Sequence, residues 1–192
     1  MLLRYFRERF PFALFVPLAA VIAAVVRMGI DSWASFAADA GFAVLLLAQF
    51  RLWDDLADRE RDRLPHPNRV LVRTDAVTQA VAFCGALGVL NICLAVWRDS
   101  SGISVSVLTA INAALAIWYL ARSSRTAAGE HLLLAKYPAI VIVVAGARIL
   151  VAPVQVLGFA AVLYVCVCAY EAWHDPAGPL ARRARLSPGG QS

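Results

Sequence analysis

Long apolar runs separated by short charged stretches form the pattern of this chain. Six runs stand out, and each is close to the ~20 residues that a helix needs to cross a bilayer. They cover residues 12–28, 33–50, 76–96, 103–120, 137–151 and 154–173. The pattern therefore predicts an all-α, polytopic membrane helical bundle of about six transmembrane helices.

The amino-acid composition also indicates a membrane environment. Of the 192 residues, 61% are hydrophobic and only 16% are charged, whereas a soluble domain carries roughly a quarter charged residues. The charges gather between the apolar runs instead of covering one face of each helix. We expect residues 1–175 to form a single membrane-embedded domain. Residues 176–192, which are rich in proline and glycine, are expected to form a flexible cytoplasmic tail.

The basic residues predict the orientation. If both ends of a six-span chain lie on one side, that side holds fifteen of the 18 basic residues, and the other holds only Arg27, Arg98 and Arg148. Loops rich in arginine stay in the cytoplasm, so we expect a multi-pass protein with both termini cytoplasmic. The many alanines, and arginine in place of lysine at all basic positions but one, indicate a bacterial source and hence the inner (cell) membrane.

Two other kinds of binding are not predicted. The formal net charge of +5 does not indicate a nucleic-acid partner, because the arginines flank apolar helices and the topology explains them. The four cysteines lie inside apolar runs, and Cys166 and Cys168 point apart on a helix. We therefore expect the lipid bilayer as a partner, with no nucleic acid, no zinc site and no disulfide framework.

Four aspartates follow the second apolar run. They are Asp54, Asp55, Asp58 and Asp62. If the second helix continues past the run, Asp54, Asp58 and Asp62 share one face, where like charges repel. A divalent cation would compensate them, since Mg²⁺ takes oxygen ligands and completes its shell with substrate phosphates. The three arginines interleaved with the aspartates, at positions 59, 61 and 63, could instead neutralise the row through ion pairs, and both alternatives stay open on composition alone.

The spacing of these aspartates resembles the first aspartate motif of the UbiA-type intramembrane prenyltransferases. That motif, Asn/Asp-Asp-x-x-Asp-x-x-x-Asp, likewise follows the second helix. Here it reads Asp54-Asp55-x-x-Asp58-x-x-x-Asp62, and the resemblance continues downstream into residues 66–71. These read His-Pro-Asn-Arg-Val-Leu and are similar to the family's His-Pro-x-Arg-Pro-Leu, with valine in place of proline. Upstream, residues 7–11 and Arg51-Leu52 are also similar to members of the superfamily.

A second acidic motif of the family, Asp-x-x-x-Asp, lies at the cytoplasmic end of the sixth helix. The corresponding place here holds Glu171-Ala-Trp-His-Asp175, which keeps the spacing but begins with glutamate. Tyr119 and Lys136-Tyr137 are similar to the family's tyrosine and its phosphate-contacting lysine. The alternative interpretation of 171 and 175 is an isolated acidic pair at a helix end.

The resemblance implies a fold, a reaction and a set of site residues. The expected reaction is transfer of a prenyl group from a prenyl diphosphate to a lipophilic or aromatic acceptor within the membrane, dependent on Mg²⁺ or Mn²⁺. The four aspartates would hold one ion, and Glu171 and Asp175 a second, which makes all six the expected catalytic and metal-binding residues. Arg69, Lys136 and Tyr119 would bind the substrate.

One departure from the family bears on these expectations. Its members usually have nine helices, whereas six are predicted here. The chain would then form a homo-oligomer, enclose a smaller cavity, or have lost catalysis. Two other functions therefore stay open: a membrane terpene cyclase or diphosphate lyase that uses the same aspartates, and a non-catalytic membrane subunit with a degenerate UbiA scaffold.

Overall fold

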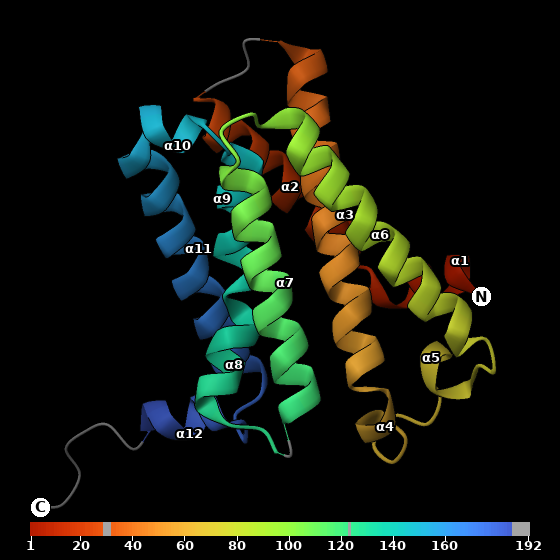
Figure 1. Ribbon diagram of the computed structural model, residues 1–192. Coiled ribbons are helices and arrows are strands. Elements are labelled where there is room, and N and C mark those ends of the chain that lie inside the picture. The colour runs from red at the N-terminus through yellow and green to blue at the C-terminus, as the bar shows by residue number, and fades with distance from the viewer. Residues whose placement is uncertain (29–31, 123, 186–192) are drawn as a thin grey trace, which may run out of the picture.

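The computed structural model describes residues 1–28, 32–122 and 124–185. In these ranges every regular element is a helix (Figure 1). In chain order the helices are α1 (Leu2–Arg9), α2 (Phe12–Arg27), α3 (Trp33–Ala57), α4 (Arg59–Asp62), α5 (Val70–Arg73), α6 (Val77–Arg98), α7 (Ile103–Ala121), α8 (Ala127–Leu134), α9 (Lys136–Ala145), α10 (Arg148–Val151), α11 (Pro153–His174) and α12 (Pro179–Arg185).

Five segments of the described chain are long and apolar enough to cross a membrane. They are α3, α6, α7, the consecutive pair α8–α9 (Ala127–Ala145) and α11. The pair α1 and α2 would be a sixth span, but its two helices meet at 79°. The bend falls at Pro11, because a proline forces the residue before it into an extended conformation and Phe10 has φ −109° and ψ 96°. The prediction of an all-α protein is confirmed for the described residues, with five apolar spans, or six if the bent pair of α1 and α2 is counted as one.

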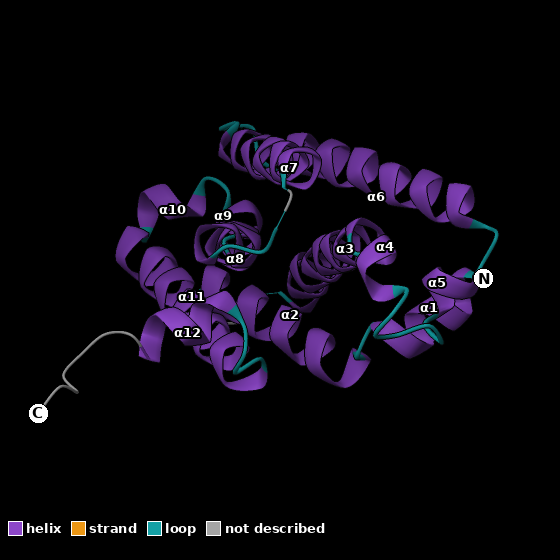
Figure 2. Ribbon diagram, turned by 90° about the horizontal axis from the view of Figure 1, so that it is seen from below, coloured by secondary structure: helices purple, strands orange, loops and turns teal. Residues whose placement is uncertain are grey.

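Helices α3 and α9 form the interior of the bundle (Figure 2). Helix α9 packs against α2, α3, α7 and α11, and seven of its ten residues are buried. The outer helices α6, α7 and α11 bury only a narrow stripe and leave large apolar side chains exposed, among them Val89, Ile117 and Val162. Exposed apolar faces of this extent are typical of helices that contact lipid.

Three amide side chains link the helices midway along the bundle. The Gln49 side-chain nitrogen donates to the Asn112 side-chain oxygen at 2.9 Å, and the Asn91 nitrogen donates to the Gln49 oxygen at 2.8 Å. Gln49 and Asn91 are buried. Hydrogen bonds of this kind replace the hydrophobic effect as a force between membrane helices, so this amide chain joins α3, α6 and α7.

The fifth apolar segment begins ten residues and ends six residues earlier than expected, since it covers Ala127–Ala145. Residues 127–134 were expected to belong to a loop but form α8, whose first turn is capped by the Thr126 hydroxyl accepting from the Gly129 N–H at 3.1 Å. The segment ends at Gly146, where φ is +53° and a Cβ atom would lie 2.8 Å from the Ser104 hydroxyl. The expected range 137–151 was wrong because Glu130 and Lys136 interrupt the apolar run, although both side chains face the interior and are buried.

The segment after Asp175 also differs from the expected flexible tail. Pro179–Arg185 forms α12, which packs against α8 and α11. Leu180 and Ala181 are buried in that contact, and the Leu180 N–H donates to the Glu130 carboxylate at 3.0 Å. Residues 186–192 of the expected tail lie outside the described residues. The physical reason for the difference is the apolar Leu-Ala pair, which gives a short polar helix one face to bury.

Candidate functional site

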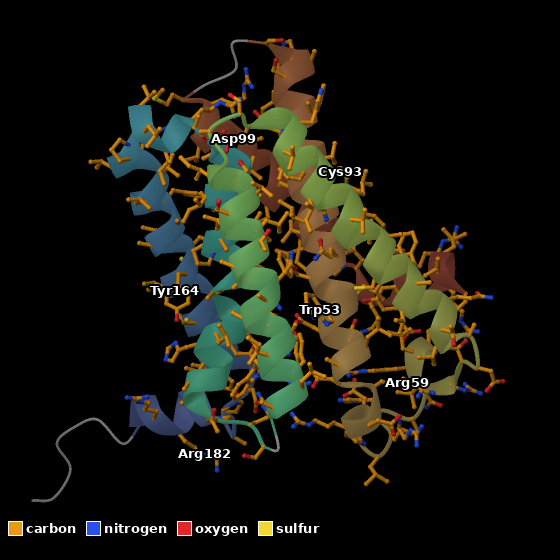
Figure 3. All side chains as sticks on the ribbon, in the orientation of Figure 1. Trp53, Arg59, Cys93, Asp99, Tyr164 and Arg182 are labelled. Atoms are coloured by element: carbon orange, nitrogen blue, oxygen red, sulfur yellow. The ribbon has the colours of Figure 1, made fainter. Side chains whose placement is uncertain are left out.

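A cavity of about 470 Å³ lies at one end of the bundle, between the end of α3, α4, α7, α8, α9 and α11. Figure 3 labels Arg59 and Arg182 at the two sides of this end. Eight of the nine residues that the resemblance implies line the cavity. They are the four motif aspartates, two basic residues, a tyrosine and a glutamate: Asp54, Asp55, Asp58, Asp62, Arg69, Lys136, Tyr119 and Glu171. The ninth, Asp175, does not line it.

The aspartates keep helical spacing although α3 ends before the row does. Helix α3 runs to Ala57, and a turn at Asp58 leads into α4. The Asp58 N–H donates to the Asp54 carbonyl, and the Asp62 N–H to the Asp58 carbonyl, each at 2.9 Å. The expected continuation of the second helix beyond residue 50 is therefore confirmed as far as Ala57, and its hydrogen-bond pattern reaches Asp62.

Asp54 lies at the meeting point of three helices. Its carboxylate accepts hydrogen bonds from the Lys136 ammonium on α9 and from the Tyr119 hydroxyl on α7. The ammonium is buried, with a side-chain exposure of 7%. Asp54, an expected metal ligand, thus contacts two of the residues that were expected to bind the substrate.

Asp55 points to a different neighbour. The Arg9 guanidinium binds it with two hydrogen bonds, at 2.7 and 3.2 Å, and the Tyr5 hydroxyl donates to it at 2.8 Å. Successive residues on a helix are about 100° apart, so Asp55 faces α1 while Asp54 faces α7 and α9. This bidentate pair fastens α1 to α3 and leaves Asp55 little freedom to bind a ligand.

Distant arginines, and not the interleaved ones, neutralise the rest of the row. Arg122, at the end of α7, donates to Asp58 at 2.7 Å, and Arg69 pairs with Asp62. Of the three interleaved arginines, two pair with Glu60, at 3.1 and 2.9 Å. No ion pair between those three and the motif aspartates occurs among the described residues. The alternative that the interleaved arginines neutralise the row is therefore wrong, because cations from other segments do so.

The second acidic motif surrounds one guanidinium. Arg125 contacts Asp175 at 2.8 Å, Glu130 at 2.6 Å and Glu171 at 3.8 Å. Burial alone would lower the pKa of Arg125, but the hydrogen bond to Asp175 and the charge of Glu130 outweigh it and raise that pKa. The guanidinium therefore stays charged. Asp175 is brought to the rim of the site only through this arginine.

The two motifs differ in their fitness for a metal ion. Across the described part of the chain, no three Asp, Glu, His or Cys side chains are grouped so that they could hold one. In the first motif, Asp54 and Asp58 lie one helical turn apart on the cavity wall and offer the oxygen donors that Mg²⁺ prefers. Their chemistry fits an ion if their cationic partners turn away. In the second motif a guanidinium already lies among the carboxylates.

Several lining residues were not singled out from the sequence. Three of them pair with motif carboxylates, namely Arg9, Arg122 and Arg125. A fourth, Glu130, pairs with Arg125. A further one is Gly129, which lies against Trp118: a Cβ atom at 129 would lie 1.8 Å from the indole ring. The only available signal was a glycine and a glutamate next to each other inside an otherwise apolar segment.

Comparisons with protein-family models, curated proteins and solved structures find no match to this chain. The assignment of the site therefore depends on the residues themselves and their arrangement around the cavity.

Proposed function

We propose that this chain is a UbiA-type intramembrane prenyltransferase, which transfers a prenyl group from a prenyl diphosphate to a lipophilic or aromatic acceptor. One observation carries the proposal. Residues that the motif resemblance implies come from four separate stretches of sequence, between positions 54 and 171, and they line one cavity at the end of an apolar bundle. A charged pocket that opens where apolar helices end suits a substrate with an anionic head and a hydrocarbon chain.

The cations of the cavity supply the proposed binding of the diphosphate. Three cations of the cavity each pair with a carboxylate, namely Lys136, Arg69 and Arg122. Their donors would exchange that carboxylate for phosphate oxygens, an acceptor that guanidinium groups bind in a bidentate manner. Asp54, Asp58 and Asp62, released from these pairs, would hold Mg²⁺, which supplies positive charge to the departing diphosphate when it is bound.

The proposed reaction breaks the bond between the first prenyl carbon and the diphosphate oxygen. The electron pair of that bond leaves with the diphosphate, and the acceptor nucleophile bonds to the same carbon and loses its proton. Lys136 and Arg122 would stabilise the negative charge that grows on the leaving oxygen. The rings of Trp118 and Tyr119, which line the cavity, would face the allylic cation.

We also propose that the cavity faces the cytoplasm of a bacterial cell. The argument is the distribution of arginine, since Arg27, Arg98 and Arg148 are the only basic residues expected on the other side, and all three meet at one carboxylate away from the cavity. Reporter fusions would test this. Fusions after residue 101 and at the C-terminus should report opposite sides, and the same side for both would contradict it.

A second candidate is a non-catalytic membrane subunit. The observation that favours it is that each motif carboxylate is paired with a cation of the chain itself. A site already neutralised in this way could serve only to hold the helices together. Turnover by the purified protein separates the two candidates.

The experiment is an assay of pyrophosphate release by the purified protein with Mg²⁺, a panel of prenyl diphosphates and extracted membrane acceptors. The wild-type chain should release pyrophosphate and form a prenylated product. Asp58→Asn should lower the rate by about 100-fold, since it removes one of the proposed carboxylate ligands of the Mg²⁺ that stabilises the leaving diphosphate. Asp75→Asn, an exposed aspartate outside the cavity lining, is the matched control and should leave the rate unchanged.

Release without a prenylated product would identify a lyase or cyclase. No release with any donor would favour the subunit.

A further inference from the structure

One guanidinium lies where the second acidic motif was expected to hold a metal ion. Arg125 is in the connection between α7 and α8. Of its three carboxylate neighbours, Glu130 is on α8, Glu171 is on α11, and Asp175 directly follows α11. One terminal nitrogen is 2.8 Å from Asp175, and the other is 2.6 Å from Glu130 and 3.8 Å from Glu171. Three negative charges thus converge on a single positive one.

This arrangement excludes a metal ion at the same point. Mg²⁺ binds carboxylate oxygens at about 2.0–2.1 Å and requires a nearly regular octahedron of oxygens. The oxygens of Glu130 and Asp175 are already used by a planar donor that stays charged at any physiological pH. An ion could bind to these carboxylates only after the guanidinium had left.

The position of Arg125 is held by its surroundings. Glu130 is 5% exposed, and its second oxygen accepts the Leu180 N–H at 3.0 Å. That contact connects it to α12 and prevents the carboxylate from turning. Thr126, the next residue after Arg125, caps α8 through the Gly129 N–H. Arg125 thus lies between a helix cap and a buried carboxylate, while half of its side chain stays exposed.

We infer that Arg125 takes the place of a second divalent cation, so that the site binds one ion, at the first motif, and its other half is served by a guanidinium. The inference deepens the proposed function, on which it rests. Arg125 also lines the cavity, as Lys136 does, so its charge would be available to a diphosphate bound there.

The test counts metal ions directly. Purified protein in detergent is titrated with Mn²⁺ in the presence of inorganic diphosphate, and bound Mn²⁺ is measured by electron paramagnetic resonance. The wild-type chain should bind one ion. Arg125→Gln removes the guanidinium and lets Glu171 and Asp175 move toward Glu130, so this variant should bind one more. Arg61→Gln is the matched control, since Arg61 lines the same cavity and has no ion pair with a described residue; its count should equal that of the wild type.

A second variant keeps the test decisive if Arg125→Gln does not fold. Asp175→Asn, in an otherwise wild-type chain, should still bind one ion, because no ion occupies the second motif. Two ions in the wild type, no gain in folded Arg125→Gln, or a loss in Asp175→Asn would each overturn the inference. No Mn²⁺ binding by the wild type would overturn the proposed metal-dependent function as well. If the Mn²⁺ counts are as expected but the protein releases no pyrophosphate, the role of Arg125 is supported and the proposed prenyl transfer is contradicted.

Discussion

The ammonium group of Lys136 on α9 donates to the carboxylate of Asp54 on α3, so two charges that lie 82 residues apart form one pair in the wall of the cavity. The side chain of Lys136 is 7% exposed and that of Asp54 20%. Because both side chains are largely buried, either charge would destabilise the folded protein if its partner were removed. The pair is thus both a structural contact between central helices and the core of the candidate site.

Lys136→Met should destabilise the protein by about 3 kcal/mol, since it leaves the Asp54 charge partly buried with only the Tyr119 hydroxyl as a partner. Adding Asp54→Asn should restore most of this loss, because the unpaired charge is then gone. Chemical denaturation in detergent micelles measures both. A double variant less stable than Lys136→Met would contradict the assignment of the pair.

Asp39→Asn should be among the most destabilising substitutions outside the cavity. Asp39 is fully buried, and its carboxylate binds Arg27 at 2.8 Å, Arg148 at 3.1 Å, and Arg98. Removing the charge leaves three arginines without it, which should cost about 3 kcal/mol or more. Arg148→Gln is the comparison: that side chain is 39% exposed, so its loss should cost about 1 kcal/mol or less. Equal losses would show that Asp39 does not hold the cluster together.

Acid should destabilise the protein through Asp99. Burial alone would raise the pKa of this carboxyl, but hydrogen bonds from Ser101 and Ser104 outweigh it and lower the pKa from 3.8 to about 2. Because the pKa is lower in the folded state, the stabilisation is complete above about pH 4 and disappears as the pH falls to about 2. It should amount to about 2 kcal/mol.

Asp99→Asn should remove this part of the pH dependence while the rest of the acid transition stays. Arg98 and Arg148 line the same cavity as Asp99. Both are present in the variant and in the wild type, so the comparison isolates the carboxyl group of Asp99. Unfolding curves between pH 2 and pH 6 measure the difference between variant and wild type. A constant difference over that range would contradict the role of Asp99.

Gly129→Ala should displace the Trp118 indole from the cavity wall. The added Cβ atom would lie 1.8 Å from a ring carbon, so the ring must move, at a cost of about 2 kcal/mol. The shift should change tryptophan fluorescence and weaken diphosphate binding. Gly158→Ala, with nothing within 4 Å of its Cβ position, is the control. Combining Gly129→Ala with Trp118→Leu should recover stability, because the smaller side chain makes room.

The residue ranges of a helix could be predicted where an uninterrupted apolar run matches the thickness of a bilayer. The ranges 76–96 and 103–120 come within two residues of α6 and α7, because an apolar segment must be long enough to span. The fifth helix could not be located in this way. Its charged residues Glu130 and Lys136 resemble a loop in the sequence, and they are tolerated inside because Arg125 and Asp54 neutralise them.

The members of the site could be predicted better than its pairings. Regular spacing places the aspartates on one helical stretch, and the resemblance adds Tyr119, Lys136 and Glu171, all of which line the cavity. Their counter-ions come from segments up to 82 residues away. Local rules reach only three or four residues along a helix, so they suggested the interleaved arginines, whereas the fold supplies others.

The contact between Arg27 and Asp39 bears on how the chain enters a membrane. The two residues are twelve positions apart, at 2.8 Å, on the neighbouring helices α2 and α3. A lone aspartate in a spanning helix costs about 2.5–3.5 kcal/mol during insertion. Since the chain emerges from the ribosome N-terminus first, this hairpin can neutralise its own charge before Arg98 or Arg148 has been synthesised. Replacing Arg27 would therefore lower the efficiency of membrane insertion as well as the stability of the folded protein.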